Sequence, residues 1–156
     1  MIEIISYEDK YQPDFKRLNL EWLDKYDLTE AHDLEMLDDP QKTVIAGGGC
    51  IFLAMDGDKV IGSAGLFKMN EREYELIKMG VDPAYRGQGI SKSLLNRCLE
   101  EAGKIKASTL ILYSNSQLKT ALKLYEKYGF RHVTAVNAPF LTADVKMELT
   151  LTLNQP

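Results

Sequence analysis

The sequence predicts an α+β fold in a single domain that spans residues 1–156. Short apolar runs bounded by turn residues indicate strands, and apolar residues at helical spacing indicate amphipathic helices. The chain contains no internal repeat or linker, and 156 residues are enough for one domain with its own core.

Strand and helix patterns follow one another along the chain and define the expected elements. The expected strands cover residues 2–6, 50–55, 59–67, 73–81, 109–113, 131–134 and 143–153. The expected helices cover residues 7–25, 30–37, 90–103 and 116–128.

Capping residues set the expected boundaries of the first two helices. Ser6 and Asp9 have the spacing of a capping box before the first helix. Thr29 is the expected cap of the second helix, and Pro40 follows its end.

Turn residues predict the connections in the rest of the chain. Asp56-Gly57-Asp58 predicts a hairpin between the second and third strands. Gly129 is expected to end the last helix as its C-cap, and residues 135–142 are expected to form a loop.

Alternation along residues 73–81 predicts which side chains share a face of that strand. The face of interest is expected to carry Glu75, Ile77, Met79 and Val81. Gly80 and Pro83 are suited to weakening regular strand pairing at its end.

Composition and charge exclude several classes of function. A net charge of −4 argues against nucleic acid as the main partner, because phosphate contacts need a basic face. No apolar stretch reaches the roughly 20 residues of a membrane span, and the N-terminus lacks a signal-peptide pattern. We therefore expect a cytoplasmic protein without membrane contact.

Cysteine and histidine usage predicts neither a disulfide framework nor a metal site. Cys50 and Cys98 are too few for a framework, and Cys98 lies on an apolar helix stripe where burial is expected. His32 and His132 are isolated and are interpreted as surface or packing residues.

An acidic stretch between Glu21 and Asp39 contains eight carboxylates and one lysine. Two interpretations are open. It forms a solvated helix face, or it forms a rim that attracts a cationic amine.

A glycine-rich turn, Arg86-Gly87-Gln88-Gly89-Ile90-Ser91, lies between an apolar strand and an amphipathic helix. Glycines allow close backbone approach, and a helix N-terminus offers unpaired N–H donors. Arg86 adds a positive charge, so the turn is a candidate seat for a pyrophosphate. An ordinary helix N-cap is the alternative, because the turn lacks the Gly-Lys-Ser/Thr of nucleotide hydrolases and a full GxGxxG pattern.

A second motif, Leu124-Tyr125-Glu126-Lys127-Tyr128-Gly129-Phe130, follows about 35 residues later. Together the two motifs resemble the GNAT superfamily of acyl-CoA N-acyltransferases. Its phosphate-binding pattern is Arg/Gln-x-x-Gly-x-Gly/Ala after a strand ending in Val-x-Pro. Arg86 and Gly89 match this pattern, and Ser91 replaces the last small residue. The second motif resembles the family's Leu-Tyr-x-x-x-Gly-Phe.

The resemblance implies the architecture and the cosubstrate. The expected fold is a mixed, mostly antiparallel sheet of about seven strands, flanked by about four helices. The expected cosubstrate is acetyl-CoA, without a metal. Its pyrophosphate is expected to bind Arg86, Gly87, Gln88, Gly89, Ile90 and Ser91.

Glu75 is the first candidate for the base that removes a proton from an attacking amine. A carboxylate on a mostly apolar strand face favours a raised pKa, and the family often has a water-polarising glutamate on this strand. A solvated strand end without a chemical role is the alternative, and Glu73 is the fallback base.

The resemblance places Tyr125 near the sulfur of coenzyme A. There its hydroxyl would stabilise the leaving thiolate through a hydrogen bond. Tyr125 also falls at helical spacing with Leu118, Ala121 and Leu122, so a purely structural core position is the alternative.

The remaining cofactor contacts are also implied by the resemblance. Backbone groups of Met79 and Val81 are expected to bind the acyl carbonyl and the pantetheine arm. Asn115 is a candidate for the pantetheine amide, with a helix cap as the alternative. The family's asparagine, seven residues before the tyrosine, is replaced by Leu118 here.

The sequence therefore predicts an N-acetyltransferase that moves an acetyl group from acetyl-CoA to a primary amine by direct attack. The alternative is a non-catalytic, CoA-binding sensor or interaction module. The acceptor is a small-molecule amine or a peptide amine, and the sequence leaves a homodimer open.

Overall fold

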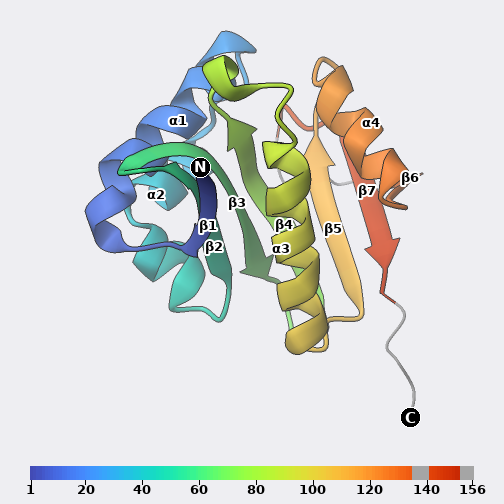
Figure 1. Cartoon of the computed structure of the whole chain (residues 1–156). Helices are drawn as coiled ribbons and strands as arrows, with labels where there is room; N and C mark the ends of the chain where they lie inside the picture. Colours follow the sequence, from blue (N-terminus) through green and yellow to red (C-terminus); the bar gives the residue numbers. More distant parts are fainter. Residues whose placement is uncertain (135–140, 152–156) are drawn as a thin grey trace.

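The computed structural model describes residues 1–134 and 141–151 of the chain. Within these residues, seven strands form one mixed sheet (Figure 1). The strands are β1 (Ile2–Ser6), β2 (Cys50–Asp56), β3 (Lys59–Lys68), β4 (Glu73–Val81), β5 (Thr109–Ser114), β6 (Arg131–Val133) and β7 (Val145–Thr150). Their order is β1-β2-β3-β4-β5-β7-β6, with β4 and β5 parallel and the other neighbours antiparallel. The predicted fold class is confirmed.

Four α-helices in the described part of the chain cover the sheet. They are α1 (Gln12–Lys25), α2 (Ala31–Asp38), α3 (Ile90–Lys104) and α4 (Lys119–Lys127). Short 3₁₀ segments at Asp9–Tyr11 and Pro83–Tyr85 and a π-helical segment at Gln41–Ile45 accompany them. Figure 1 shows α3 lying along one face of the sheet in front of β4, with α4 to its right.

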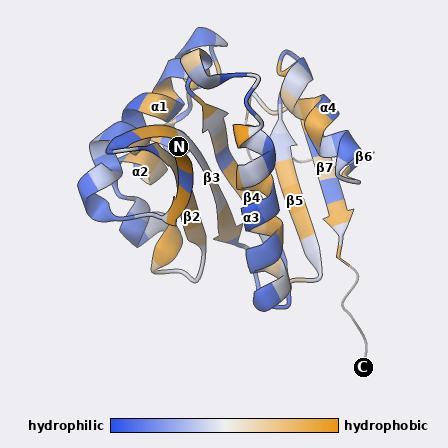
Figure 2. Ribbon diagram, viewed as in Figure 1, coloured by the Kyte–Doolittle hydropathy of each residue, from blue (hydrophilic) through white to orange (hydrophobic). Residues whose placement is uncertain are grey.

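Two hydrophobic cores lie on opposite faces of the sheet. On β2, Ile51 and Leu53 pack in the core under α1 and α2, whereas Phe52 and Ala54 pack in the core under α3. Burying each large apolar side chain stabilises the fold by about 1.5–3 kcal/mol. Figure 2 shows the hydrophobic residues on the strands and on stripes of the helices, with hydrophilic residues over the rest of the helix surfaces.

Helix α3 forms where the apolar stripe predicted it. Ile90, Leu94, Cys98 and Ala102 are buried along one side of the helix. Cys98 is fully buried, which confirms its predicted place in the core.

Helix α1 begins later than predicted. Its first helical residue is Gln12, with Pro13 in the first turn, where a missing N–H costs little. The capping box expected from Ser6 and Asp9 is wrong, because the Asp9 carboxylate accepts a hydrogen bond from the Tyr7 hydroxyl at 3.1 Å.

The cap of α2 is also one residue away from the predicted position. Glu30 is the N-cap, and its backbone N–H donates to the Asp33 carboxylate at 2.9 Å. Thr29 does not cap the helix, because its hydroxyl donates to Asp24 at 2.6 Å.

The remaining boundaries follow the prediction closely. Gly57, with φ +61°, turns the β2–β3 hairpin, and Gly129, with φ +97°, follows α4. Helix α4 begins at Lys119 because residues 115–118 form a separate turn. Of the predicted loop at residues 135–142, residues 135–140 lie outside the described residues.

Strands β4 and β5 diverge after a short parallel contact. Only Glu73, Tyr74 and Glu75 of β4 pair with β5, at Thr109, Leu110 and Ile111. Strand β4 continues beside β3 as far as Val81. The sheet therefore opens between β4 and β5, and Glu75 lies where the opening begins.

A bulge in β4 changes which side chains share a face. Ile77 pairs with Gly65 and Gly80 pairs with Ser63, so two residues of β4 lie opposite one residue of β3. The first of these, Lys78, has a left-handed φ of +50°.

The predicted common face for Glu75, Ile77, Met79 and Val81 is therefore wrong. Ile77 packs in the core under α1 and α2, whereas Met79 and Val81 pack against the core under α3. Gly80 serves close packing, because a Cβ there would lie 2.6 Å from the indole nitrogen of Trp22.

Candidate active site

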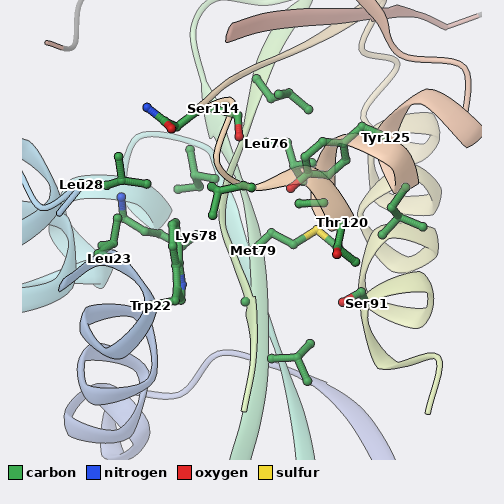
Figure 3. Close-up of a pocket in the computed structure, with 18 of the residues that line it drawn as sticks. Trp22, Leu23, Leu28, Leu76, Lys78, Met79, Ser91, Ser114, Thr120 and Tyr125 are labelled. Carbon is green, nitrogen blue, oxygen red and sulfur yellow. The ribbon is translucent and has the colours of Figure 1, made fainter. Parts of the chain in front are cut away.

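One cavity of about 570 Å³ is lined by residues from both faces of the opened sheet. Figure 3 shows Lys78 beside Trp22, Leu23 and Leu28 on one side of β4. On the other side, Met79 extends toward Ser91 and Thr120, near Tyr125. We call the end near Trp22 and Lys78 the acceptor chamber and the end near Ser91 and Tyr125 the cofactor end.

Most of the predicted site residues meet at this cavity. Its lining includes Glu75, Met79, Val81, Arg86, Gly87, Gly89, Ile90, Ser91, Asn115 and Tyr125. Gln88 and the fallback base Glu73 are not part of the lining. The structure thus brings the two sequence motifs together, while the role of each residue stays a prediction.

The glycine turn has the conformation that an anion site needs. Gly87 and Gly89 have φ values of +81° and +76°, and a Cβ built on either would meet no atom within 4 Å. The Gly89 carbonyl accepts the first helical hydrogen bond, from Ser93 N–H at 3.1 Å. The preceding N–H groups, those of residues 90–92, are the unpaired donors of the helix N-terminus. The turn therefore offers open space and unpaired N–H donors where the sequence predicts a pyrophosphate.

Side-chain contacts hold this turn against the β2–β3 hairpin. The Tyr85 hydroxyl donates to the Asp56 carboxylate at 2.5 Å. Asp82 accepts a hydrogen bond from Ala84 N–H at 2.9 Å and lies 3.8 Å from the ammonium of Lys59. These contacts fix the turn before any ligand binds.

Two further lysines line the cofactor end and were not predicted. Lys92 lies in the first turn of α3, and Lys119 begins α4. With Arg86 they bring three cations from three segments to one cavity. Sequence spacing alone did not distinguish them from other surface lysines.

Tyr125 belongs both to the core and to the cavity wall. It is 7% exposed, and its ring packs edge-on against Phe130 with centroids 5.8 Å apart. Its hydroxyl has no hydrogen-bond partner among the described residues. Burial, with the nearby Cys98, raises the pKa of Tyr125 far above its ordinary value, so the group stays protonated and can donate. The structural and chemical interpretations of Tyr125 are thus compatible.

Glu75 is a carboxyl group largely removed from water. It is 7% exposed at the point where β4 and β5 separate. Burial raises the pKa of Glu75 from 4.5 to about 7, with Lys78 lowering it and Asp33 raising it. The expected alternative, a solvated strand end, is inconsistent with this burial.

A buried ion pair lies beside Glu75 in the acceptor chamber. The Lys78 ammonium donates to the Asp33 carboxylate, and both side chains are more than nine-tenths buried. His32 also lines the cavity, with its Nε2 3.3 Å from Asp33, and burial lowers its pKa. Asp33 is therefore buried in an ion pair, whereas both interpretations of the acidic stretch place its carboxylates on the surface.

A hydrogen-bond network centred on the fully buried Asn19 and Ser63 supports the bulge. The Asn19 amide donates to the Ser63 hydroxyl at 3.0 Å, and that hydroxyl donates to the Lys78 carbonyl at 2.6 Å. The Trp22 indole N–H donates to Asn19 at 3.0 Å. This network fixes the Trp22 ring and the backbone of β4 next to the cavity, and it links residues that no local motif connects.

Hydrogen bonds also join the walls of the acceptor chamber. The Glu30 carboxylate accepts from the N–H groups of Leu141 and Thr142 at 3.1 and 2.9 Å. Burial tends to raise the pKa of Glu30, but the hydrogen bonds from Thr142 outweigh it, so the pKa is lowered. Gln117 donates to the Tyr26 carbonyl at 3.3 Å. These contacts connect the α1–α2 turn with the segments that follow β5 and precede β7.

Asn115 is occupied by contacts within the protein. Its amide nitrogen donates to the Thr142 carbonyl at 2.8 Å, and its oxygen accepts from Gln117 N–H at 3.0 Å. These are contacts of a turn and capping residue. The predicted contact with pantetheine stays a prediction.

None of the helices within residues 1–134 and 141–151 has the length and apolar composition of a membrane span. No group of three or more His, Cys, Asp or Glu residues is placed there to hold a metal ion.

Sequence comparison finds acetyltransferases. The model of the acetyltransferase (GNAT) family matches residues 9–130. N-acetylaspartate synthetase of Rattus norvegicus is 36% identical over 102 residues, which are 65% of this chain and 34% of that protein. The chain thus spans about a third of this relative. The uncharacterized N-acetyltransferase YvbK of Bacillus subtilis is 30% identical over 115 residues, covering 71% of this chain and 73% of YvbK.

Solved structures share the whole fold. A GNAT-family acetyltransferase from Staphylococcus aureus Mu50 superposes with a TM-score of 0.90 at 21% identity, over 97% of this chain and all of that one. The PaiA N-acetyltransferase of Thermoplasma acidophilum, in complex with coenzyme A, gives a TM-score of 0.78 at 18% identity, over 97% and 99% of the two chains. The family model, the relatives and the fold agree that this chain belongs to the GNAT family of acetyltransferases.

Proposed function

We propose that the protein transfers an acetyl group from acetyl-CoA to a primary amine by direct attack. One observation carries the proposal. A single cavity joins the glycine turn and Tyr125 on one side of the opened sheet to Glu75 on the other. Relatives named N-acetyltransferase and N-acetylaspartate synthetase support transfer to nitrogen.

The cofactor end has the groups that would hold coenzyme A. Arg86, the N–H groups at the start of α3 and the open glycines would hold the pyrophosphate. Acetyl-CoA, when bound, supplies an activated thioester. The hydroxyl of Tyr125 would donate a hydrogen bond to the sulfur as negative charge develops there.

Glu75 would act from the opposite side of the gap. An amine with a pKa of about 10 is almost fully protonated at pH 7 and cannot attack a thioester in that form. A carboxylate with a pKa near 7 is suited to accept its proton, directly or through a water molecule. In this proposal Glu75 would accept the proton of the attacking amine, and Tyr125 would stabilise the leaving thiolate.

Thiol release in the presence of an amine library tests the proposal. Purified protein, acetyl-CoA and each amine are incubated, free thiol is measured, and mass spectrometry follows an increase of one acetyl group in the amine. Amine-dependent thiol release with the acetylated product is expected. Tight binding of coenzyme A without turnover for any amine would support the non-catalytic module instead.

A further inference from the structure

The acceptor chamber contains two buried groups of opposite chemistry with unused hydrogen-bonding capacity. Glu75 is 7% exposed, and its carboxyl has no hydrogen-bond partner among the described residues. The Lys78 side chain is 8% exposed and donates to Asp33. An ammonium has three donors, and the structure gives Lys78 no other acceptor in the described part of the chain. Both residues line the cavity.

Because both groups line the cavity, a ligand bound there can satisfy their unused donors and acceptors. We infer that the acetyl acceptor is a small amine that also carries a carboxylate, as an amino acid does. Its carboxylate binds the free donors of Lys78, and its amino group faces Glu75. This inference rests on the proposed acetyl transfer.

The order of charges in the chamber favours such an acceptor. In the inferred complex, the charges alternate in sign along the chamber. Their order is Asp33, Lys78, the acceptor carboxylate, the acceptor ammonium and Glu75. Lys78 and Glu75 are near enough for the lysine to lower the pKa of the carboxyl, yet they form no ion pair with each other. Each therefore keeps its capacity for a substrate group. A polyamine would instead bring a second cation toward Lys78, and like charges repel strongly in a buried site.

The walls of the chamber indicate a small and partly apolar acceptor. Leu23 and Leu28 line it, and the indole N–H of Trp22 is already bonded to Asn19, so Trp22 presents its apolar ring. The contacts of Glu30 with Thr142 join the chamber walls. These features favour a free small molecule over an amine on the surface of a folded protein.

Matched pairs of amines test the inference on the wild-type protein. Each pair consists of an amino acid and its decarboxylated amine, such as leucine with 3-methylbutylamine and phenylalanine with 2-phenylethylamine. The two amines also differ in pKa, so each kcat/KM is divided by the fraction of unprotonated amine at the assay pH. The ratio of these corrected values within a pair isolates the carboxylate. We expect the amino acid to be preferred by roughly 10- to 100-fold in the best pair, as a charge-assisted hydrogen bond implies. A spermidine control should be a poor acceptor.

Variants of the Lys78–Asp33 ion pair then test whether Lys78 binds the carboxylate of the acceptor. Lys78→Met should reduce the preference within the pair to about 3-fold or less. Because this variant leaves Asp33 buried without its partner, the double variant Lys78→Met/Asp33→Asn is measured beside it. Lys104→Met is the matched control, because Lys104 is 61% exposed near the end of α3, outside the cavity lining, and should keep the wild-type preference.

The outcomes separate this inference from the proposed function. Acetylation of both members of every pair with equal efficiency would overturn the inference and leave the acetyltransferase activity standing. A carboxylate preference that survives in the double variant would also overturn it. Absence of thiol release with every amine tested would reject the proposed function itself, and the inference with it.

Discussion

The side chain of Glu75 combines deep burial with an accessible cavity. The residue is 7% exposed, and burial raises the pKa of its carboxyl to about 7. A general base works in its deprotonated form, so the free enzyme gains activity as pH rises through this value. The titration of this one residue should therefore be visible in the kinetics.

We predict that Glu75→Gln removes an inflection near pH 7 from the kcat/KM profile. The plateau should also fall by about 100-fold or more, because a glutamine cannot take up the proton. Glu73→Gln is the matched control, since Glu73 lies on the same strand but not on the cavity. If the inflection persists in Glu75→Gln and disappears in Glu73→Gln, then Glu73 is the base.

The hydroxyl of Tyr125 should matter to rate but not to folding. We predict that Tyr125→Phe lowers kcat by about 10- to 1000-fold, with little change in acetyl-CoA affinity. The melting temperature should hardly change, because the hydroxyl has no hydrogen-bond partner among the described residues. Tyr128→Phe, at the end of the same helix and outside the cavity lining, is the control. A normal kcat with a large loss of stability would show that Tyr125 is structural.

At the scale of elements, the strand–turn–helix unit from β4 to α3 forms the cofactor end. We predict that Gly89→Val weakens coenzyme A binding by about 2 kcal/mol or more, roughly 30-fold. The new side chain would enter open space at the helix N-terminus, where the pyrophosphate must approach, and φ +76° would add strain. Calorimetric titration with coenzyme A measures the effect.

Gly57→Val provides the control for strain alone. Gly57 has φ +61° and similar open space, but it lies at the β2–β3 hairpin away from the cavity lining. We expect both variants to lose a similar amount of stability, and only Gly89→Val to bind coenzyme A more weakly. Equal affinities for coenzyme A would contradict the phosphate-binding role of the turn.

The bulge of β4 depends on a hydroxyl from the neighbouring strand. We predict that Ser63→Ala lowers the free energy of unfolding by about 1–3 kcal/mol, because the Asn19 amide and the Lys78 carbonyl each lose their hydrogen bond with the Ser63 hydroxyl. It should also lower kcat/KM, since Lys78 and Met79 lose their support. Ser108→Ala, whose exposed hydroxyl lies 3.3 Å from the Arg72 carbonyl, should change neither quantity. Denaturant unfolding and initial rates together check this prediction.

The elements themselves were largely predictable because their signals are local. Three local patterns each specify one type of element. They are the apolar stripe from Ile90 to Ala102, the Asp-Gly-Asp hairpin and the run from Glu73 to Val81. The bulge has no such signal, because the residue with positive φ is a lysine, not a glycine. Strict alternation through Lys78 therefore predicts the wrong face for Met79 and Val81.

At the scale of the whole molecule, the acceptor chamber depends on contacts between distant parts of the chain. Asp33 reaches Lys78 across 45 residues of sequence, and Asn19 reaches Ser63 across 44. The predicted cofactor residues lie mostly within two compact motifs, and the structure brings both motifs to one cavity. The acceptor chamber combines α1, α2 and β4, so its chemistry emerges only in three dimensions.

Burial of Glu75 where the sheet opens destabilises the folded protein when this carboxyl is ionised. Glu75 must be buried at the apex of the gap between β4 and β5, and the higher pKa in the folded state means that folding disfavours its ionised form. Between pH 4.5 and about 7 the unfolded chain has lost the proton while the folded protein keeps it. The contribution of Glu75 to stability therefore falls as pH rises through this window and stays unfavourable above it.

We predict that Glu75→Gln is relatively more stable at pH 8 than at pH 4. The gain from pH 4 to pH 8 should reach about 3 kcal/mol at most, because a pKa shift of one unit corresponds to 1.36 kcal/mol. The same comparison can be made in the double variant Lys78→Met/Asp33→Asn, which replaces the ion pair by neutral residues. The effect of Glu75→Gln on stability should still depend on pH there, because burial is the main cause of the raised pKa of Glu75. Thermal unfolding of the variant and the wild type at both pH values measures the difference. A difference in stability that does not depend on pH would mean that Glu75 titrates normally, and it would remove the physical basis for the role of Glu75 as the base. The predicted gain in stability, together with a loss of activity, would show that the buried carboxylate lowers the stability of the protein and is needed for the reaction.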